Sequence, residues 1–394
     1  MDRDMKVTFY SNFLTHHQVP FCIEMQKRLG DDFKFVSTMK IFQWRLELGF
    51  KDLDQEYDFV VRAYENKESY EEAKKLALES DVVIIGSTTD ELIEERLKQD
   101  KLTFRYRSRI FLFIDGLFKT IFNKEKLNLL YTRHIKYKKN KNLYLLCANA
   151  YGPNDFNALG LYKNKIYKWG YFLETNKYDI EKLIDDKEKN DKIEIIWVAR
   201  FIKWKHPEVV IKLAKNLKRQ NYNFEIKMLG TGKLEEKIKA QIKKEDLSDV
   251  VTVVGQVPSE QVKNYMEKAN IFIGTSASAE GWGAVINESM NAGCAVIANR
   301  RMGSVPYLIK DKENGLMYNN YKELEENVKL VIDNKELRRK LSTNAYKYIT
   351  EKWTSSIAAE NLIELFNSII NGEELKVEDG PASKATNYKY RKEI

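Results

Sequence analysis

The sequence predicts an α/β protein made of two Rossmann-like domains, and three observations support this prediction. The chain has 394 residues, and because a single hydrophobic core stops growing near ~250–300 residues, we expect two domains. Strand-like apolar runs alternate with helical patterns, which is typical of parallel sheets covered by helices. A highly charged stretch, 176–192, separates two such sets, and we interpret it as a linker.

The first set predicts six strands with helices between most of them. The strands are expected at 6–10, 33–36, 57–61, 82–86, 102–106 and 143–147. The second set repeats the scheme more regularly. Its strands are expected at 193–198, 224–229, 250–254, 271–274 and 295–298, and its helices at 207–217, 234–244, 259–269 and 284–291. Three further helices are expected at 322–333, 335–350 and 355–370.

The composition is that of a soluble globular protein, with 43% hydrophobic and 31% charged residues. No apolar run approaches the ~18–20 residues that span a bilayer, and the first residues lack the apolar core of a signal peptide. Cys22, Cys147 and Cys294 are far apart and have apolar neighbours, so we expect buried thiols in a cytoplasmic protein. A secreted disulfide module and a disordered chain are excluded.

The net charge of +8 is unevenly distributed. Residues 101–141 hold twelve Lys or Arg and two acids, whereas 51–100 hold fifteen acids and seven bases. Because the basic stretch also contains apolar residues, it is a candidate for contact with an anionic membrane surface. The alternative is a solvated basic face over buried aliphatic residues. We find no nucleic-acid recognition module beside it and predict no nucleic-acid partner.

The most informative motif is GTSASAEGWGAVINESMNAGCAVIA, residues 274–298. A strand ends, a loop of small residues follows, and a helix begins near Gly283 or Ala284. Gly281 and Gly283 would let backbone N–H groups approach an anion there. Glu280 and Glu288 flank this point, and a carboxylate beside an anion site suits hydrogen bonds from sugar hydroxyls. The alternative is that both glutamates are surface groups.

Two further loops carry candidate binding residues. Arg200 follows a buried strand and Lys205 precedes a helix, so the two cations could hold a diphosphate. Gly230 and Gly232 follow the next strand without forming a Walker motif. They would permit close approach of a ligand, although a plain strand-to-helix turn explains them equally well.

The first strand ends in YSNFLTHHQVPF, which is unlike the glycine-rich turn of dehydrogenases. His16 and His17 lie in this loop and could bind a hydroxyl group, and His134 lies in the basic stretch. Each is a candidate, although a histidine is more often a surface or satisfied polar residue. No spacing suits a metal site or a serine hydrolase, so we predict no catalytic metal.

In order along residues 197–298, the segments VARFIKWK, LGTG, VVGQVP and EGWGAVINESMNAGCAVIA resemble the retaining glycosyltransferase family 4, of bacterial surface-glycan type. GSVPYLIKDKENGLMY fits the next segment of that family. The resemblance implies a GT-B fold, with two Rossmann-like domains facing across a cleft. It implies an acceptor-side domain at 1–175 and a nucleotide-sugar domain at 190–353. A helix at 354–371 would cross back to the first domain, and 372–394 would form a loosely ordered tail.

The resemblance also implies roles for single residues. Arg200 and Lys205 would neutralise the donor diphosphate, Glu280 would hold sugar hydroxyls, and Glu288 would hold the ribose. The catalytic set is then Glu280, Arg200 and Lys205, and the donor-binding set is Gly230, Gly255, Val257, Gly281, Trp282, Gly283, Ala284 and Glu288. Two positions depart from the family pattern: Tyr307 stands where a Glu is usual, and Trp282 where a Phe is frequent.

The resemblance implies transfer of a sugar from a UDP- or GDP-sugar to a glycan or lipid-linked acceptor in surface polysaccharide or glycolipid assembly. We expect a cytoplasmic enzyme, peripheral to the inner membrane face, with no permanently bound cofactor. Two alternatives stay open: a nucleotide-sugar 2-epimerase of the same fold, and a non-catalytic subunit of a glycosylation complex. The acceptor-side candidates are His16, His17 and His134.

Overall fold

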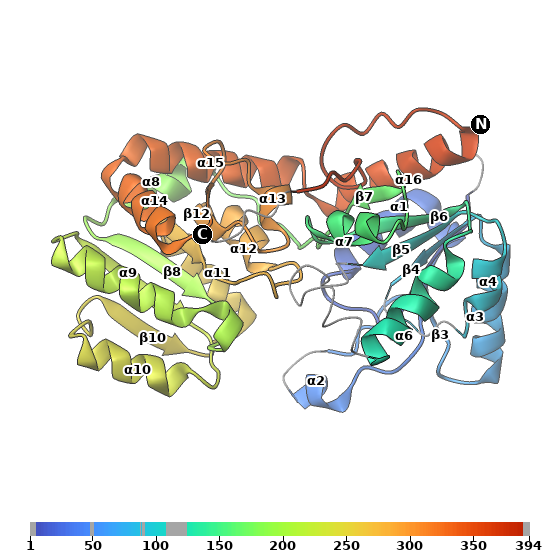
Figure 1. Ribbon diagram of the computed structural model, residues 1–394, viewed down its shortest axis with the longest axis horizontal. Coiled ribbons are helices and arrows are strands. Elements are labelled where there is room, and N and C mark those ends of the chain that lie inside the picture. The colour runs from blue at the N-terminus through green and yellow to red at the C-terminus, as the bar shows by residue number, and fades with distance from the viewer. Residues whose placement is uncertain (1–4, 48–50, 87, 89–90, 108–123, 389–394) are drawn as a thin grey trace. The chain divides into compact units, whose positions relative to one another are not determined.

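The computed structural model describes residues 5–47, 51–86, 88, 91–107 and 124–388, and the chain divides into two compact units (Figure 1). Unit 1 comprises Met1–Glu174 and Ser355–Tyr388, and unit 2 comprises Thr175–Thr354. Each unit is built on its own parallel sheet. The two α/β domains that the sequence predicts are therefore confirmed.

Unit 1 contains a seven-stranded parallel sheet with the order β3-β2-β1-β4-β5-β6-β7. The strands are β1 (Val7–Ser11), β2 (Phe33–Ser37), β3 (Val60–Arg62), β4 (Val82–Ile85), β5 (Thr103–Arg107), β6 (Leu143–Cys147) and β7 (Ile166–Lys168). The helices are α1 (Val19–Leu29), α2 (Gln43–Glu47), α3 (Lys67–Glu79), α4 (Glu94–Lys98), α6 (Lys124–Arg133), α7 (Gly152–Ala158) and α16 (Ser355–Asn371).

Unit 2 contains a six-stranded parallel sheet with the order β10-β9-β8-β11-β12-β13. The strands are β8 (Ile193–Val198), β9 (Phe224–Leu229), β10 (Val251–Gly255), β11 (Ile271–Gly274), β12 (Ala295–Asn299) and β13 (Leu316–Tyr318). The helices are α8 (Ile180–Glu188), α9 (Pro207–Arg219), α10 (Glu235–Lys244), α11 (Ser259–Lys268), α12 (Val285–Asn291), α13 (Val305–Leu308), α14 (Tyr321–Asp333) and α15 (Lys335–Glu351).

The central strands read as apolar runs because helices cover both faces of each sheet. Every residue of β1, β4 and β11 is buried. The predicted strands are found, with ends shifted by a few residues. The sequence analysis missed β7 and β13, which are three residues long and lie at sheet edges.

Helix α16 follows unit 2 in the sequence but packs in unit 1, as predicted. It runs along α1, and Figure 1 shows it in red beside that helix. The Phe366 ring lies 5.0 Å from the ring of Phe104 in β5. This helix therefore completes the core of unit 1.

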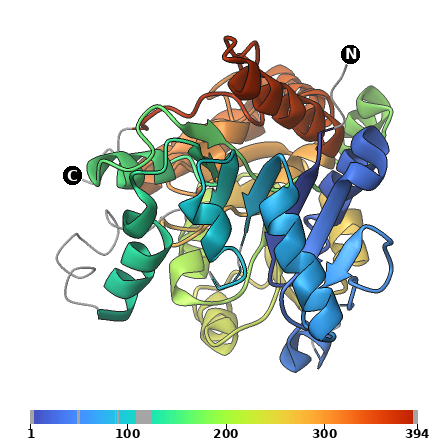
Figure 2. The same cartoon turned by 90° about the vertical axis from the view of Figure 1, so that its right-hand side faces the viewer.

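The segment after α16 corrects the prediction of a loosely ordered tail. Ala382 donates its backbone N–H to Lys168 O over 2.8 Å, and Lys168 N–H donates to Ser383 O over 2.8 Å. Ala382 and Ser383 are both fully buried. Because β7 is an edge strand with unpaired backbone groups, a short antiparallel segment can cover it. Figure 2 turns unit 1 toward the viewer, with α16 and this segment in red.

The stretch 176–192 is also more ordered than a linker. It contains α8, which Asp179 caps by accepting a hydrogen bond from the Lys182 N–H over 3.1 Å. Its charged residues pair with α15: Arg338 donates two hydrogen bonds to the Glu188 carboxylate, at 2.8 and 2.7 Å. The highly charged segment therefore contains an amphipathic helix, and the prediction of a linker from its composition was wrong.

Lys187 of α8 is buried, and its ammonium group joins the ends of two helices. Its three N–H donors are shared among four backbone carbonyl oxygens at 2.6 to 3.2 Å from Nζ, those of Met266, Ala269, Ala292 and Gly293. The first two carbonyls end α11 and the last two end α12, where unpaired carbonyls favour a cation. Burial disfavours the charged form of Lys187 and lowers its pKa. The carbonyl oxygens at the two helix ends are the groups that stabilise an ammonium ion at this buried position.

We therefore expect Lys187→Met to lower the free energy of unfolding by about 3 kcal/mol, because it leaves several buried carbonyls without a donor. Denaturant unfolding would measure this change. Lys182→Met, at an exposed position of the same helix, is the control and should change the free energy by less than about 0.5 kcal/mol. Equal effects of the two substitutions would contradict the role of Lys187.

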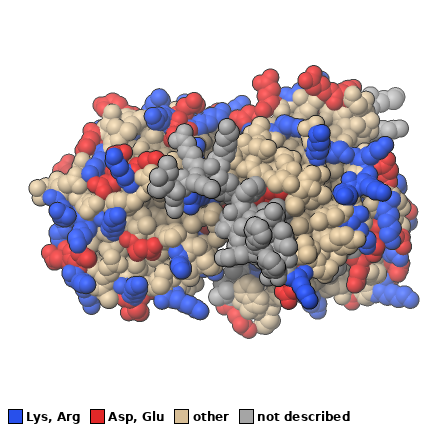
Figure 3. All heavy atoms as spheres, viewed as in Figure 1, with Lys and Arg blue, Asp and Glu red and all other residues tan. Residues whose placement is uncertain are grey.

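Charge and cysteine positions complete the comparison with the sequence. Figure 3 shows Lys and Arg interspersed with Asp and Glu over the visible face. Within the basic stretch 101–141, residues 108–123 lie outside the described residues. Cys22, Cys147 and Cys294 are buried as predicted. Among the helices in the described residues, none is both long enough and apolar enough to span a membrane.

Candidate functional site

The topology of unit 2 singles out two loops. From β8 the chain proceeds to β9 and β10 on one side, whereas from β11 it proceeds to β12 and β13 on the other. Open α/β sheets bind ligands at such a reversal, beyond the carboxyl ends of the two neighbouring strands. The loops that follow β8 and β11 are residues 199–206 and 275–284. They contain Arg200, Lys205 and Glu280, the three residues predicted to be catalytic.

Direct contacts hold these two loops together. The backbone N–H of Ala277 donates to Trp204 O over 2.9 Å. The buried Thr275 hydroxyl accepts a hydrogen bond from the Trp197 indole N–H over 2.7 Å and donates to Lys205 O. Trp197 is a residue of β8, is 1% exposed and packs in the hydrophobic core of unit 2. Thr275 thus fixes the backbone of Lys205 to the core.

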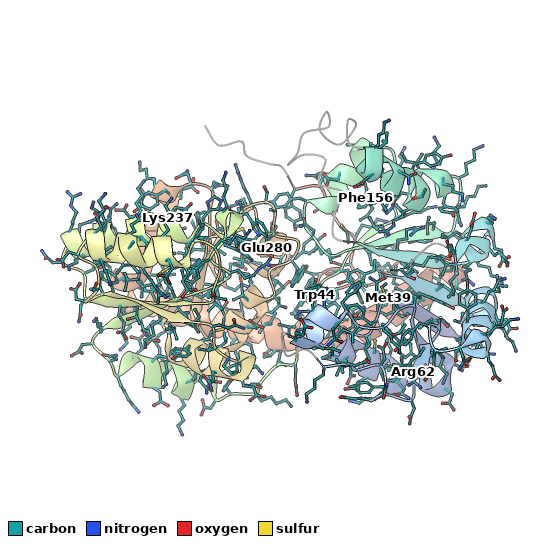
Figure 4. The ribbon with its side chains drawn as sticks, turned by 90° about the horizontal axis from the view of Figure 1, so that it is seen from below. Met39, Trp44, Arg62, Phe156, Lys237 and Glu280 are labelled. Atoms are coloured by element: carbon teal, nitrogen blue, oxygen red, sulfur yellow. The ribbon has the colours of Figure 1, made fainter. Side chains whose placement is uncertain are left out.

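Lys205 and Glu280 form an ion pair, with side chains 14% and 16% exposed. The pair is better shielded from water than a surface pair, so its electrostatic interaction is stronger. Figure 4 labels Glu280 on its loop in unit 2. An ammonium group has three N–H donors, so Lys205 can hold a carboxylate and a phosphate oxygen together. Glu280 therefore fixes the ammonium group in position.

Arg200 lies in the same loop, with its guanidinium carbon 5.6 Å from the centroid of the Trp204 ring. This cation–π contact orients the guanidinium group while its edge can still donate hydrogen bonds. Arg200 is exposed, and Trp204 is 41% exposed. The structure therefore brings Arg200, Lys205 and Glu280 to one edge of one sheet.

The glycines after β9 have a structural explanation. Gly230 has φ +125°, and a Cβ atom on it would lie 2.1 Å from Ala199 O. At Gly232 a Cβ atom would lie 2.7 Å from Phe201 O. Both glycines therefore let the loop after β9 pack against the backbone next to Arg200. The Phe201 N–H donates a hydrogen bond to Thr231 O over 2.9 Å and holds the two loops together. Direct donor contact by Gly230 stays a prediction.

The other predicted donor-binding residues lie near the same edge of the sheet. Gly255 ends β10, and its carbonyl accepts a hydrogen bond from Gly230 N–H over 2.8 Å. Val257 follows it and is half-buried. Helix α12 begins at Val285, directly after the 281–284 segment, and Glu288 lies inside the helix. Burial raises the pKa of the half-buried Glu288, and the charge of Lys263 opposes this.

The two departures from the family pattern contact the same tryptophan. Trp282 is 3% exposed, and its ring is stacked on Trp353 at 5.6 Å. The Tyr307 ring lies 6.1 Å from Trp353 and 6.3 Å from Trp282. A Cβ atom on neighbouring Gly283, where φ is +89°, would lie 2.9 Å from Met302 Cε. Trp282 therefore anchors the loop into an aromatic cluster of unit 2.

Unit 1 has a reversal of its own, between β1 and β4. The loop after β1 carries His16 and His17, whose ring centroids are 3.7 Å apart, and His17 stacks on Tyr171 at 4.7 Å. Burial, with the charges of His16 and Arg45, lowers the pKa of His17 to about 3. The pKa of His16 is lowered by burial and by Arg45. Neutral rings at neutral pH can both donate and accept hydrogen bonds.

The sequence analysis missed Asp54, which organises this loop. Its carboxylate accepts hydrogen bonds from the Leu14 N–H over 2.9 Å and the Ser37 hydroxyl over 2.8 Å. It thereby ties the loop after β1 to the end of β2. Asp54 lies among other acidic residues at 52–58 with no motif around it, so only the fold reveals it. Thr275 carried a weak signal, since it directly follows a buried strand.

His134 is placed differently from the acceptor-side position predicted for it. It is 3% exposed, and its Nδ1 shares a hydrogen bond of 2.8 Å with the Tyr162 hydroxyl. Its ring lies 5.1 Å from Phe156 in the core of unit 1. A ring enclosed in this way contributes to packing, and the structure does not bring it together with His16 and His17. In the part of the chain that the structure describes, no His, Cys, Asp and Glu side chains are grouped to hold a metal ion.

Comparisons with known proteins relate this chain to glycosyltransferases. Residues 179–348 match the family model described as glycosyl transferases group 1. An amylovoran biosynthesis glycosyltransferase of Erwinia amylovora, AmsK, is 31% identical over 180 residues, which are 44% of this chain and 43% of AmsK. A Campylobacter jejuni N-acetylgalactosaminyltransferase is 27% identical over 176 residues, 43% of this chain and 46% of its own. This chain therefore matches less than half of the length of these two relatives.

The solved structures show the fold. The Anabaena protein HepE, crystallised in complex with UDP, superposes with a TM-score of 0.66, covering 92% of this chain and 100% of HepE at 15% identity. Together with the two parallel-sheet units, this likeness identifies the predicted GT-B fold.

We expect Thr275→Val to displace Lys205, because it removes the hydroxyl that joins Trp197 to the Lys205 carbonyl. The free energy of unfolding should fall by roughly 1–3 kcal/mol, the cost of leaving buried polar groups unpaired. Thermal and denaturant unfolding would measure it. Thr275→Ser keeps the hydroxyl and should retain most of the stability, so equal losses in the two variants would argue against this network.

Proposed function

We propose that this protein is a retaining glycosyltransferase that moves a sugar from a nucleotide-diphosphate sugar, a UDP- or GDP-sugar, to a glycan or lipid-linked acceptor in surface polysaccharide or glycolipid assembly. The observation that carries the proposal is the joint position of Arg200, Lys205 and Glu280 at the strand reversal of unit 2. The family match over 179–348 supports it independently. The relatives are named as glycosyltransferases, which favours neither the epimerase nor the non-catalytic alternative.

The proposed chemistry follows from the charge that develops in the reaction. The bond between the sugar C1 and the diphosphate oxygen breaks, and negative charge accumulates on the leaving phosphate. Arg200 and Lys205 are fixed cations that would stabilise this charge. The acceptor oxygen bonds to C1 on the same face, and its proton passes to the leaving phosphate. With the charge balanced by side chains, we propose that turnover needs no bound metal or other cofactor.

The carboxylates have binding roles in this proposal. Glu280 would accept hydrogen bonds from hydroxyls of the donor sugar while holding Lys205. Glu288 would accept them from the ribose. Burial raises the pKa of Glu288, and hydroxyl donors would favour its ionised form. The backbone at 281–284 would contribute N–H donors to the diphosphate, and Gly255 and Val257 would border the base.

Arg200→Ala and Lys205→Ala should each lower kcat/KM for the transfer by about 10²–10³-fold, because each removes a donor aimed at the developing charge. Turnover with a radiolabelled nucleotide sugar and a glycan acceptor would measure the loss. Lys203→Ala, an exposed lysine of the same loop, is the matched control and should retain activity. The proposal fails if both substitutions leave turnover unchanged.

The acceptor and location are proposed from unit 1. The C. jejuni relative is named for action on a diphospho-undecaprenol-linked glycan. In unit 1, Leu127 and Tyr131 of α6, which lies within the basic stretch 101–141, are 39% and 54% exposed. Apolar side chains among basic residues suit the surface of an anionic membrane. We propose that the enzyme works on a lipid-linked acceptor at the cytoplasmic face of the inner membrane.

Sedimentation with phosphatidylglycerol vesicles should carry down more protein than sedimentation with phosphatidylcholine vesicles. Reversing the exposed Lys138 and Lys139 to Glu should weaken the binding by at least about tenfold, since each basic residue contributes roughly 1 kcal/mol. Lys243→Glu with Lys244→Glu, an exposed pair in unit 2, serves as the control. Binding that does not depend on lipid charge would count against a membrane role.

A further inference from the structure

The connection between β2 and β3 in unit 1 exposes two aromatic rings. Phe42 and Trp44 are 40% and 53% exposed, and their rings are stacked 6.3 Å apart with an interplanar angle of 14°. Leu46, in the same short helix α2, is 37% exposed. Figure 4 labels Trp44 on α2 and Met39 on the same connection. Grouped exposed apolar side chains of this kind mark binding surfaces in soluble proteins.

The rings rest on a buried base. Phe13, in the loop after β1, is 6% exposed and meets Phe42 edge to face at 5.9 Å. The guanidinium carbon of Arg45 lies 5.1 Å from the Phe13 centroid and 5.3 Å from the Trp44 centroid. Arg45 thus lies between a buried ring and an exposed one. We call Phe42, Trp44 and Arg45 the α2 platform.

Two backbone hydrogen bonds place the α2 platform beside the strand reversal of unit 1. Thr38 N–H donates to Ser11 O over 2.9 Å, and Met39 N–H donates to Asn12 O over 2.8 Å. They join the connection that carries the platform to the loop that carries His16 and His17. Phe13, over which the Arg45 guanidinium lies, belongs to that same loop, and the charge of Arg45 contributes to lowering the pKa of both histidines.

The chemistry of this surface matches a sugar ring that carries an anion. One face of a pyranose presents C–H bonds, which stack well on a flat aromatic ring, and its rim presents hydroxyls. Neutral imidazoles nearby can donate to and accept from such hydroxyls. A guanidinium group binds a carboxylate or a phosphate through two parallel hydrogen bonds. A lipid bilayer fits less well, because the platform offers a single arginine and two rings.

We propose that the α2 platform binds an acidic sugar residue of the acceptor glycan, with the ring stacked on Trp44 and Phe42 and the carboxylate or phosphate held by Arg45. The inference rests on the proposed glycosyltransferase function and names the substrate class of its acceptor. It makes Trp44 and Arg45 specificity-determining residues of unit 1. The charged group selects acidic over neutral glycans, and the rings supply affinity for any sugar that presents an apolar face.

Calorimetric titration of the full chain tests the proposal without turnover. The probes are a glucuronate-containing disaccharide, a neutral glucose disaccharide and glucose 6-phosphate. The glucuronate or the phosphate probe should bind at least about tenfold more tightly than the neutral one, and comparing the two acidic probes identifies the anion. Trp44→Ala should weaken binding of all probes by about tenfold, and Arg45→Gln should abolish the preference for acidic probes.

Tyr70→Ala, an exposed aromatic on α3, is the matched control and should bind as the unaltered protein does. The proposal is overturned if no probe binds, if neutral and acidic probes bind equally, or if Trp44→Ala changes nothing. Titration with a nucleotide diphosphate separates this result from the proposed function. Trp44→Ala should leave the affinity for the nucleotide diphosphate unchanged. If the transferase proposal is wrong, the unaltered protein itself should not bind any nucleotide diphosphate.

Discussion

The contact between the loops after β8 and β11 is the interaction on which the candidate site depends. Parallel strands leave only loops at their carboxyl ends, and loops need fixed contacts to hold charged groups in place. The Thr275 hydroxyl, tied to the core through Trp197, supplies one such contact. The Lys205–Glu280 ion pair supplies a second across the same two loops. Two cations can therefore stand at one sheet edge in fixed positions.

The residues around this contact explain positions that a motif leaves unexplained. Gly230 and Gly232 are needed because the backbone beside Arg200 fills the space that a side chain would occupy. Trp282 and Tyr307, where the chain departs from the family pattern, both pack on Trp353. Both departures thus belong to one aromatic cluster that packs the Gly281–Ala284 loop onto unit 2. Neither departure replaces Arg200, Lys205 or Glu280.

Sequence patterns predicted the strands well because a strand buried on both faces must be apolar throughout. They predicted the Arg200–Lys205 loop and the Glu280 loop as separate candidates because each follows a buried strand, and the family resemblance grouped the three residues. They failed where tertiary contacts decide the structure. Helix α8 appeared to be a linker because its charged residues pair with α15, a helix that is distant in the sequence. Asp54 has no local motif, and only the fold brings it to the loop that carries the histidines.

The central claim is that the strand reversal of unit 2 binds a diphosphate. The most direct test is thermal unfolding of the full chain with UDP, GDP or ADP and with the matching monophosphates, because a ligand that binds the native state raises Tm by mass action. We predict that at least one diphosphate raises Tm and that its monophosphate raises Tm much less. No protection by any of the three diphosphates, or equal protection by the matching monophosphate, would contradict the claim.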